Sequence, residues 1–141
     1  MYAALDIAKY VVNKCTIDGC PVSNLQLQKI LYYIQKEFLE RNIEFIDDPI
    51  EAWQFGPVCP EAYYYFCGFG SMPINVVYDN VIHILNDLKR TVDHIIEDKR
   101  TKNPWDLVED THHPGGAWDM VYRNGLGNHD IIPNEMILSR G

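Results

Sequence analysis

The adjacent histidines His112 and His113, with Asp110 just before them, form the stretch of this chain best suited to chemistry. A histidine beside a carboxylate can act as a general acid or base. However, His112 also stands at the predicted end of a helix, where its ring can bond the last carbonyls and complement the helix dipole. We favour this capping role, and we keep a metal-dependent enzyme that uses His112 and His113 as an alternative.

The cysteines are the other candidates for metal binding or nucleophilic attack. Zinc sites need ligands paired in both halves of a motif, and the spacings here lack a second half that carries ligands. Free cysteine otherwise behaves as a small hydrophobic residue, so we expect buried or inert thiols. No cofactor, no metal site and no catalytic residue is therefore predicted. The four thiols are Cys15, Cys20, Cys59 and Cys67.

Sequence motifs of other common activities do not occur. None of the serines lies in a G-x-S-x-G motif, and the glycines form no phosphate-binding loop. The net charge of −8, with no basic tail or arm, argues against direct nucleic-acid binding. No segment approaches the roughly 18 apolar residues of a membrane span, so no membrane contact is predicted. We expect a cytoplasmic protein with reduced thiols.

A central helix over residues 22–41 is the element expected to organise the fold. Ser23 and Gln26 have the spacing of a capping box, which sets where the helix begins. Its apolar positions keep helical spacing and predict one face turned to the core, and the opposite face is expected to be polar. The apolar positions are Leu27, Ile30, Leu31, Ile34 and Phe38, and the polar ones are Gln28, Lys29, Lys36, Glu40 and Arg41.

The remaining pattern predicts a mainly α fold, a compact single-domain helical bundle of about five to six helices. The chain of 141 residues is long enough for one proper core, so we expect one domain over residues 1–141. A small β-hairpin is predicted near residues 43–55, with its turn at 47–49. Further helices are predicted over 2–15, from Pro60 to Gly68, from Asn103, and over 117–123, with an extended pair at 131–132 and a closing helical turn at 133–138.

A long helix over residues 76–99 is also predicted, with Asn75 as its cap. Its apolar residues alternate steps of three and four, close to a heptad seam. The run is short, so intramolecular packing is favoured, and a homodimer through helix 76–99 remains an alternative. The seam consists of Tyr78, Val81, Leu85, Leu88, Val92 and Ile95.

Several motifs, in order along the chain, resemble those of the Panacea domain, the SocA-like antitoxin family. The specific ones are Ser-Asn-Leu-Gln-Leu-Gln-Lys-Ile-Leu-Tyr-Tyr at residues 23–33 and Ala-Trp-Gln-Phe-Gly-Pro-Val-Cys-Pro at 52–60. Asp-Ile-Ala-Lys-Tyr at 6–10 and Thr111-His112 followed by Trp118 add to them. The segment from His113 to Ala117 departs from the family pattern.

The resemblance implies a mainly helical protein-binding module without enzymatic activity. Members of this family neutralise toxins by direct binding, and the founding member delivers its toxin to a AAA+ protease as an adaptor. The expected partner is accordingly a toxin, a protease or, if the domain serves a phage as a counter-defence inhibitor such as an anti-CRISPR protein, a defence nuclease. An acidic surface suits a partner with a basic patch, although many proteins are acidic for solubility alone.

Surplus aromatic residues are the candidate partner-binding positions, because aromatic anchors dominate binding energy at interfaces. Trp53 and Phe55 share one face of the predicted strand and are more often core, and the consecutive tyrosines cannot all point inward. The Gly56-Pro57 corner would hold this surface rigidly. The predicted partner-binding set is Trp53, Phe55, Gly56, Pro57, Tyr63, Tyr64, Tyr65, His112 and Trp118.

Overall fold

A computed structural model describes residues 1–141 and confirms the mainly α fold, with seven α-helices and one small sheet. No helix has both the length and the hydropathy that crossing a bilayer needs. The helices are α1 (Ala4–Ile17), α2 (Asn24–Leu39), α3 (Pro60–Phe66), α4 (Asn86–Lys99), α5 (Pro104–Thr111), α6 (Ala117–Tyr122) and α7 (Asn134–Arg140). Short 3-10 turns follow α3 (Cys67–Phe69) and α6 (Arg123–Gly125).

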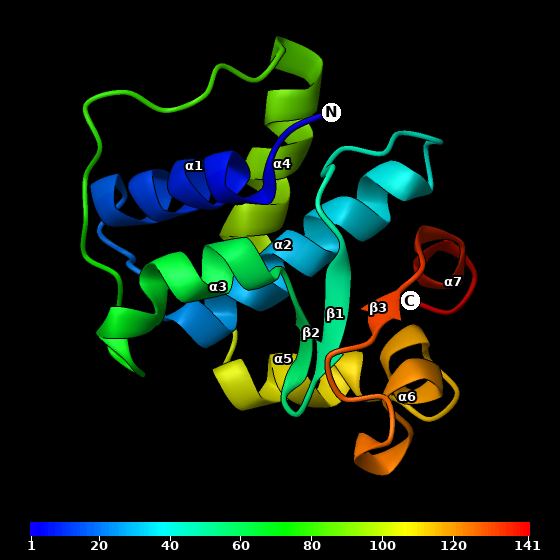
Figure 1. The fold of residues 1–141 in the computed structure, drawn as a ribbon. Coiled ribbons are helices and arrows are strands. Elements are labelled where there is room, and N and C mark those ends of the chain that lie inside the picture. The colour runs from blue at the N-terminus through cyan, green and yellow to red at the C-terminus, as the bar shows by residue number, and fades with distance from the viewer.

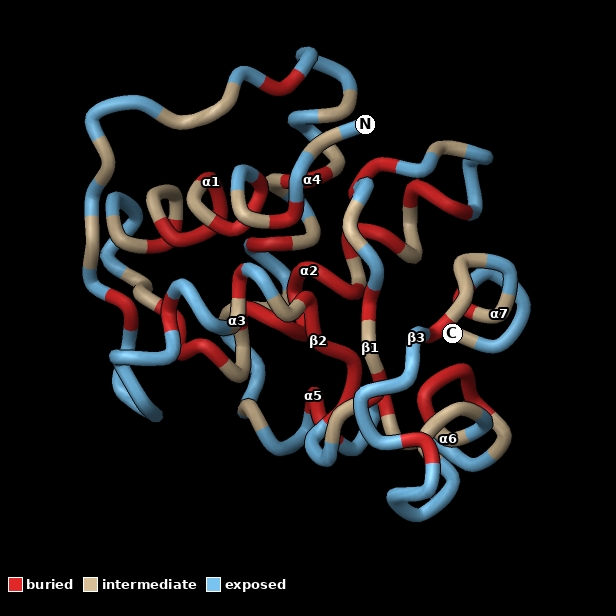
Figure 2. The backbone as a smooth tube through the Cα atoms, viewed as in Figure 1, coloured by how far each residue is buried: buried red, intermediate tan, exposed pale blue.

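Helix α2 runs through the middle of the molecule and is covered on several sides (Figure 1). The predicted capping box is confirmed, because the Ser23 hydroxyl accepts from Gln26 N at 3.3 Å while Gln26 Oε1 accepts from Ser23 N at 2.9 Å. One continuous core extends from Ala4 to Ile137, with α2 buried along much of its length (Figure 2). The helices that contact α2 are α1, α3, α4, α5 and α7.

The sheet differs from the predicted hairpin. It consists of β1 (Ile50–Trp53), β2 (Gly56–Val58) and β3 (Ile131–Ile132), in the order β2-β1-β3 with antiparallel pairing. In register, Glu51 lies opposite Val58 on one side and opposite Ile131 on the other. Residues 43–45 form no strand, so the predicted turn at 47–49 is wrong, and the chain reverses at Gln54 and Phe55 instead.

The segment before β1 packs against the start of α1 instead of forming a strand, and for this reason the hairpin prediction failed there. Ala3 stands at the N-cap of α1 and offers no capping side chain. Asp48 supplies the cap from far along the sequence, because its Oδ2 accepts from Ala4 N at 2.6 Å. Tyr2 and Ile46 form a parallel bridge beside it. The acidic pair Asp47-Asp48 therefore lies at the start of α1 rather than in a hairpin turn.

The predicted helix over 76–99 is also wrong, because α4 begins only at Asn86. Residues 75–85 run as an irregular strap around the outer side of α1, from α3 to α4 (Figure 1). Val and Ile, which are abundant in this strap, lose side-chain freedom in a helix. Two buried side chains, Ile74 and Ile84, anchor it, and Tyr78 N donates to Asn13 Oδ1 at 2.8 Å. The continuous apolar stripe on which the predicted homodimer through helix 76–99 was based is therefore absent, because residues 76–85 are not helical.

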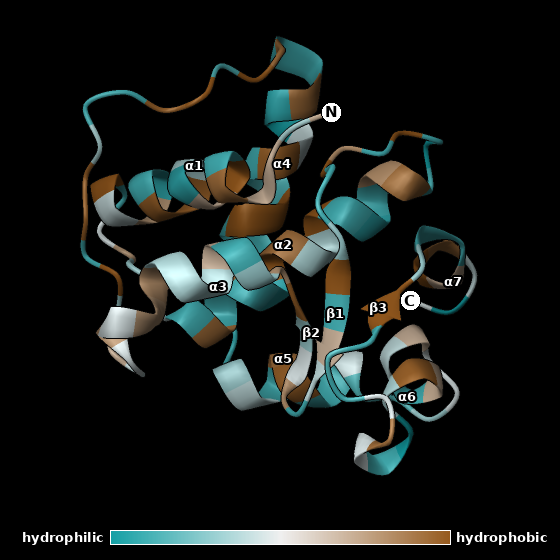
Figure 3. Ribbon diagram, in the orientation of Figure 1, coloured by the Kyte–Doolittle hydropathy of each residue, from teal (hydrophilic) through white to brown (hydrophobic).

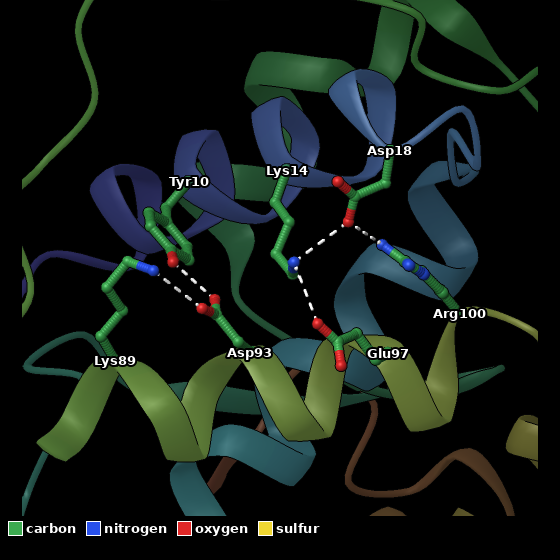
Figure 4. A network of polar contacts seen from close by, with 7 residues as sticks. All are labelled: Tyr10, Lys14, Asp18, Lys89, Asp93, Glu97 and Arg100. Atoms are coloured by element: carbon green, nitrogen blue, oxygen red, sulfur yellow. Dashed lines mark hydrogen bonds and ion pairs between the residues drawn. The ribbon is translucent and has the colours of Figure 1, made fainter. Parts of the chain in front are cut away.

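A polar network joins α1 to α4 (Figure 4). Lys14 Nζ lies 3.0 Å from Asp18 and 3.1 Å from Glu97, and Arg100 lies 2.7 Å from Asp18. Arg100, followed by Lys14, holds the pKa of the Asp18 carboxyl below its usual value. In the middle of α4, Asp93 makes a second connection to α1, because its Oδ1 accepts from the Tyr10 hydroxyl at 2.5 Å.

Replacing Tyr10 by phenylalanine is expected to lower the free energy of unfolding by about 2 kcal/mol, since a hydrogen bond to a charged acceptor is lost from a buried side chain. Denaturant unfolding of the two proteins measures the loss. Tyr64→Phe is the matched control, because the Tyr64 side chain is exposed and its hydroxyl has no partner. Equal stability of Y10F and wild type would contradict the network's role.

Candidate partner-binding groove

The polar face of α2 points inward in its first half, contrary to the sequence prediction that placed Gln28 and Lys29 on the outer face. Gln28 Oε1 accepts from Cys59 N at 2.9 Å, and Gln28 Nε2 donates to Asn24 Oδ1 at 3.0 Å. Asn24 Nδ2 in turn donates to the Tyr63 carbonyl at 3.1 Å. Polar side chains on α2 thus fasten the chain that leaves β2 and begins α3. Hydrophilic residues in the interior stretch of α2 are visible in Figure 3.

Lys29 is fully buried beneath β2. Its Nζ donates to the Pro57 carbonyl at 3.3 Å and forms no ion pair. Burial lowers the pKa of Lys29 from 10.5 to about 7, because a charged ammonium loses its hydration there. Burial likewise raises the pKa of the nearby Cys59 thiol to about 12.

Gly56 allows the backbone of β2 to come this close to Lys29. Its φ is +117°, a conformation that side chains with a Cβ rarely adopt. A Cβ at this position would lie 2.7 Å from Lys29 Cε and 2.9 Å from both Lys29 Nζ and Thr111 Oγ1. The glycine is therefore required by the backbone and by the packing of Lys29 and Thr111.

Behind the hairpin, His112 and Trp118 stack face to face, with ring centroids 3.6 Å apart and an interplanar angle of 7°. Trp118 Nε1 donates to the Trp53 carbonyl at 2.7 Å, which ties α6 to β1. His112 Nε2 is buried without a partner, and burial, followed by the charge of Lys29, lowers the pKa of the ring. The rings of His112 and Trp118 therefore support the inner side of the hairpin.

The capping role predicted for His112 belongs to its neighbour. His113 Nδ1 lies 2.7 Å from the Asp110 carbonyl near the end of α5, and His113 Nε2 lies 3.2 Å from the Arg140 carbonyl. His112 turns inward because stacking on Trp118 removes more aromatic surface from water than a position at the helix end would. The prediction for His112 is thus wrong by one residue.

A groove of about 500 Å³ lies on the outer side of this framework, between α2, the β1–β2 turn, α3, α5 and the loop before β3. Trp53 stacks on His129 with centroids 4.1 Å apart and meets Tyr63 edge-on at 4.9 Å. Phe55 and Trp105 meet edge-on at 5.5 Å and are 47% and 58% exposed. The groove therefore offers aromatic surface that the fold itself leaves uncovered.

The predicted residues do not all lie on one surface. Trp53, Phe55 and Tyr63 line the groove. The core position expected for Phe55 is wrong, because it lies in the turn between β1 and β2. Tyr64 is exposed beside Trp53, whereas Tyr65 lies apart, with Lys9 Nζ 5.0 Å from its ring centroid. The other predicted residues, Gly56, Pro57, His112 and Trp118, lie in the framework beneath.

Trp105, Asn128 and His129 line the groove and were not predicted. Trp105 was identified only as part of a helix start, which is confirmed, since Asn103 Oδ1 accepts from Trp105 N at 2.9 Å. The position of Trp105 in the first turn of a predicted helix was the one feature of the sequence that could have marked it as a surface residue. No group of three or more His, Cys, Asp or Glu side chains lies close enough together to hold a metal ion.

Comparison with known proteins places these residues in a family. The model of the family described as "Antitoxin SocA-like, Panacea domain" matches residues 27–119, more than half of the chain. The chain belongs to this Panacea family. A relative, Antitoxin SocA of Caulobacter vibrioides (strain NA1000 / CB15N), is 28% identical over 135 residues, which cover 87% of this chain and 71% of the relative. No solved structure matches the chain.

Residues from three of the four motifs that carried the resemblance meet in one place in this Panacea domain. Lys29 from the first motif bonds Pro57 from the second, and Thr111 approaches Gly56. Trp118 reaches back to the carbonyl of Trp53. Motifs that are far apart in the sequence thus build one framework, and the groove lies on its surface.

Proposed function

We propose that this protein is an antitoxin that neutralises a toxin protein in the cytoplasm by binding it, without catalysis, through the aromatic groove. Membership of the Panacea family and the relative named Antitoxin SocA support the antitoxin role. We choose the groove as the binding surface because Phe55 and Trp105 lie exposed side by side in its wall. The single continuous core supports the proposal that residues 1–141 act as one domain.

The groove has the properties of a preorganised binding surface. Trp53 is held by its stack on His129, and its Nε1 donates to Glu51 at 2.9 Å. Rigid aromatic rings give a large contact area at little cost in conformational entropy, and such residues are frequent hot spots. A toxin that buries these rings would gain affinity at little cost in side-chain entropy.

Co-expression with a candidate toxin encoded beside the gene tests this proposal. The toxin alone should stop growth, and the protein should restore it. Retained rescue in a host that lacks AAA+ proteases supports direct neutralisation, whereas rescue that needs such a protease supports an adaptor that delivers the toxin for degradation. Failure to restore growth and failure to form a complex with the toxin would together refute the antitoxin proposal.

The double variant Phe55→Ala/Trp105→Ala is expected to bind the toxin at least about 30-fold more weakly, because two anchors are truncated at about 1 kcal/mol or more each. Isothermal titration calorimetry measures the loss. Leu126→Ala is the matched control, since Leu126 is 84% exposed and does not line the groove. Unchanged affinity of the double variant, with L126A also unchanged, would place the toxin on another surface.

A further inference from the structure

Lys29 is a buried amine without a counter-ion. Its side chain has no exposed surface, and its ammonium uses only the Pro57 carbonyl, at 3.3 Å, although an ammonium has three N–H donors. The titratable groups that meet it are Cys59, after β2, and His112, at the end of α5, and neither carries a negative charge in this setting. An unpaired buried charge destabilises a fold, so its presence calls for an explanation.

The groove above Lys29 lacks acidic side chains, although the protein as a whole is acidic. Lys29 is the only charged residue that lines it, and no aspartate or glutamate contributes to its wall, although the chain carries a net charge of −8. The side chains of Gln54, Ser71 and Asn128 also line it and make no hydrogen bond within the protein. The lining thus combines aromatic rings, free polar groups and one cation, which suits an apolar segment that carries a negative charge.

We infer that the groove receives an aspartate or glutamate side chain of the partner protein, next to an aromatic or apolar residue, and that the Lys29 ammonium is its counter-ion. The inference rests on the proposed function, since it names the chemistry of the toxin segment at the same site. Lys29 has no exposed surface in the free fold, so the inference requires the exposed Gln54-Phe55 turn, which forms part of the wall, to move when the carboxylate binds. The partner thereby supplies the charge that the free fold lacks.

Blocked dipeptides test the inference without the toxin. The probes are acetyl-Trp-Glu-amide, its isostere acetyl-Trp-Gln-amide, and acetyl-Trp-Gln with a free C-terminal carboxylate. Binding is followed by NMR on the indole N–H groups, with the internally bonded Trp118 as a reference. At about pH 6.5, where Lys29 is mostly protonated, the glutamate peptide should bind about tenfold more tightly than the glutamine isostere.

The preference for the glutamate peptide should disappear in Lys29→Met and persist in Lys36→Met, which removes a lysine from the same helix outside the groove. Equal binding of the two amides, an unchanged preference in K29M, or no binding of either would overturn the inference. Tighter binding of the free C-terminal carboxylate would overturn the assignment to a side chain. Toxin rescue in cells is scored separately, so this inference can fail while the antitoxin proposal stands.

Discussion

Gly56→Ala is expected to lower the free energy of unfolding by about 3 kcal/mol. Two costs combine at this position. The φ of +117° is one that alanine rarely adopts, and the new Cβ would enter the space of Lys29 and Thr111, which are both buried. Denaturant unfolding measures the change, and circular dichroism shows whether the variant folds.

Gly19→Ala is the matched control for G56A. Gly19 also has a positive φ, +74°, but nothing lies within 4 Å of a Cβ built there. Only the backbone cost remains, so the expected loss is about 1 kcal/mol. Equal losses in the two variants would show that close packing against Lys29 adds nothing at Gly56.

Lys29→Met is expected to stabilise the free protein by about 2–4 kcal/mol at neutral pH, because it replaces an unpaired buried amine with an apolar side chain of similar length. The hydrogen bond to Pro57 is lost, but this loss is smaller than the gain. Lys36→Met, on the same helix, should change the stability by no more than about 0.5 kcal/mol. A destabilised K29M protein would contradict the interpretation of Lys29 as a strained group.

The wild-type protein should also become more stable as the pH rises from 7. The folded pKa of Lys29, about 7, lies below the ordinary 10.5, so the unfolded chain binds more protons between these values. Relative to K29M, wild type should gain about 1.5 kcal/mol between about pH 7 and pH 8.5. Comparison with K29M is needed because burial raises the pKa values of Cys15 and Cys59, which lowers the stability of both proteins at higher pH. A pH profile parallel to that of K29M would contradict the lowered pKa.

Elements that are encoded locally were predicted well. The capping box of α2 and the Asn103 cap of α5 depend on residues three positions apart or fewer, so the sequence alone reveals them. The strap at 75–85 shows the limit of periodicity, since its apolar residues keep a helical spacing while tertiary anchors at Ile74 and Ile84 hold it extended. Burial also overrode the pattern at Lys29, because α2 is covered on several sides and has no fully solvated face there.

Of the five aromatic rings in the groove wall, three could be proposed from the sequence. Trp53, Phe55 and Tyr63 belong to one aromatic-rich stretch that the sequence displays. Trp105 and His129 come from segments far along the chain, and only the tertiary fold brings them beside it. The hydrogen bond from Lys29 to the Pro57 carbonyl could not be predicted either, because every residue has a backbone carbonyl and the residue type does not show which one is used.

The boundaries of the family match have a consequence for how this scaffold can diversify. The matched segment, residues 27–119, contains Lys29, Gly56 and Trp118 of the framework. Asn128 and His129 lie outside this segment, and they line one side of the groove. If the groove is the toxin-binding surface proposed above, substitutions in the loop that carries them would change that surface and leave Lys29, Gly56 and Trp118 in place. The domain would then acquire a new toxin specificity without any change to its framework.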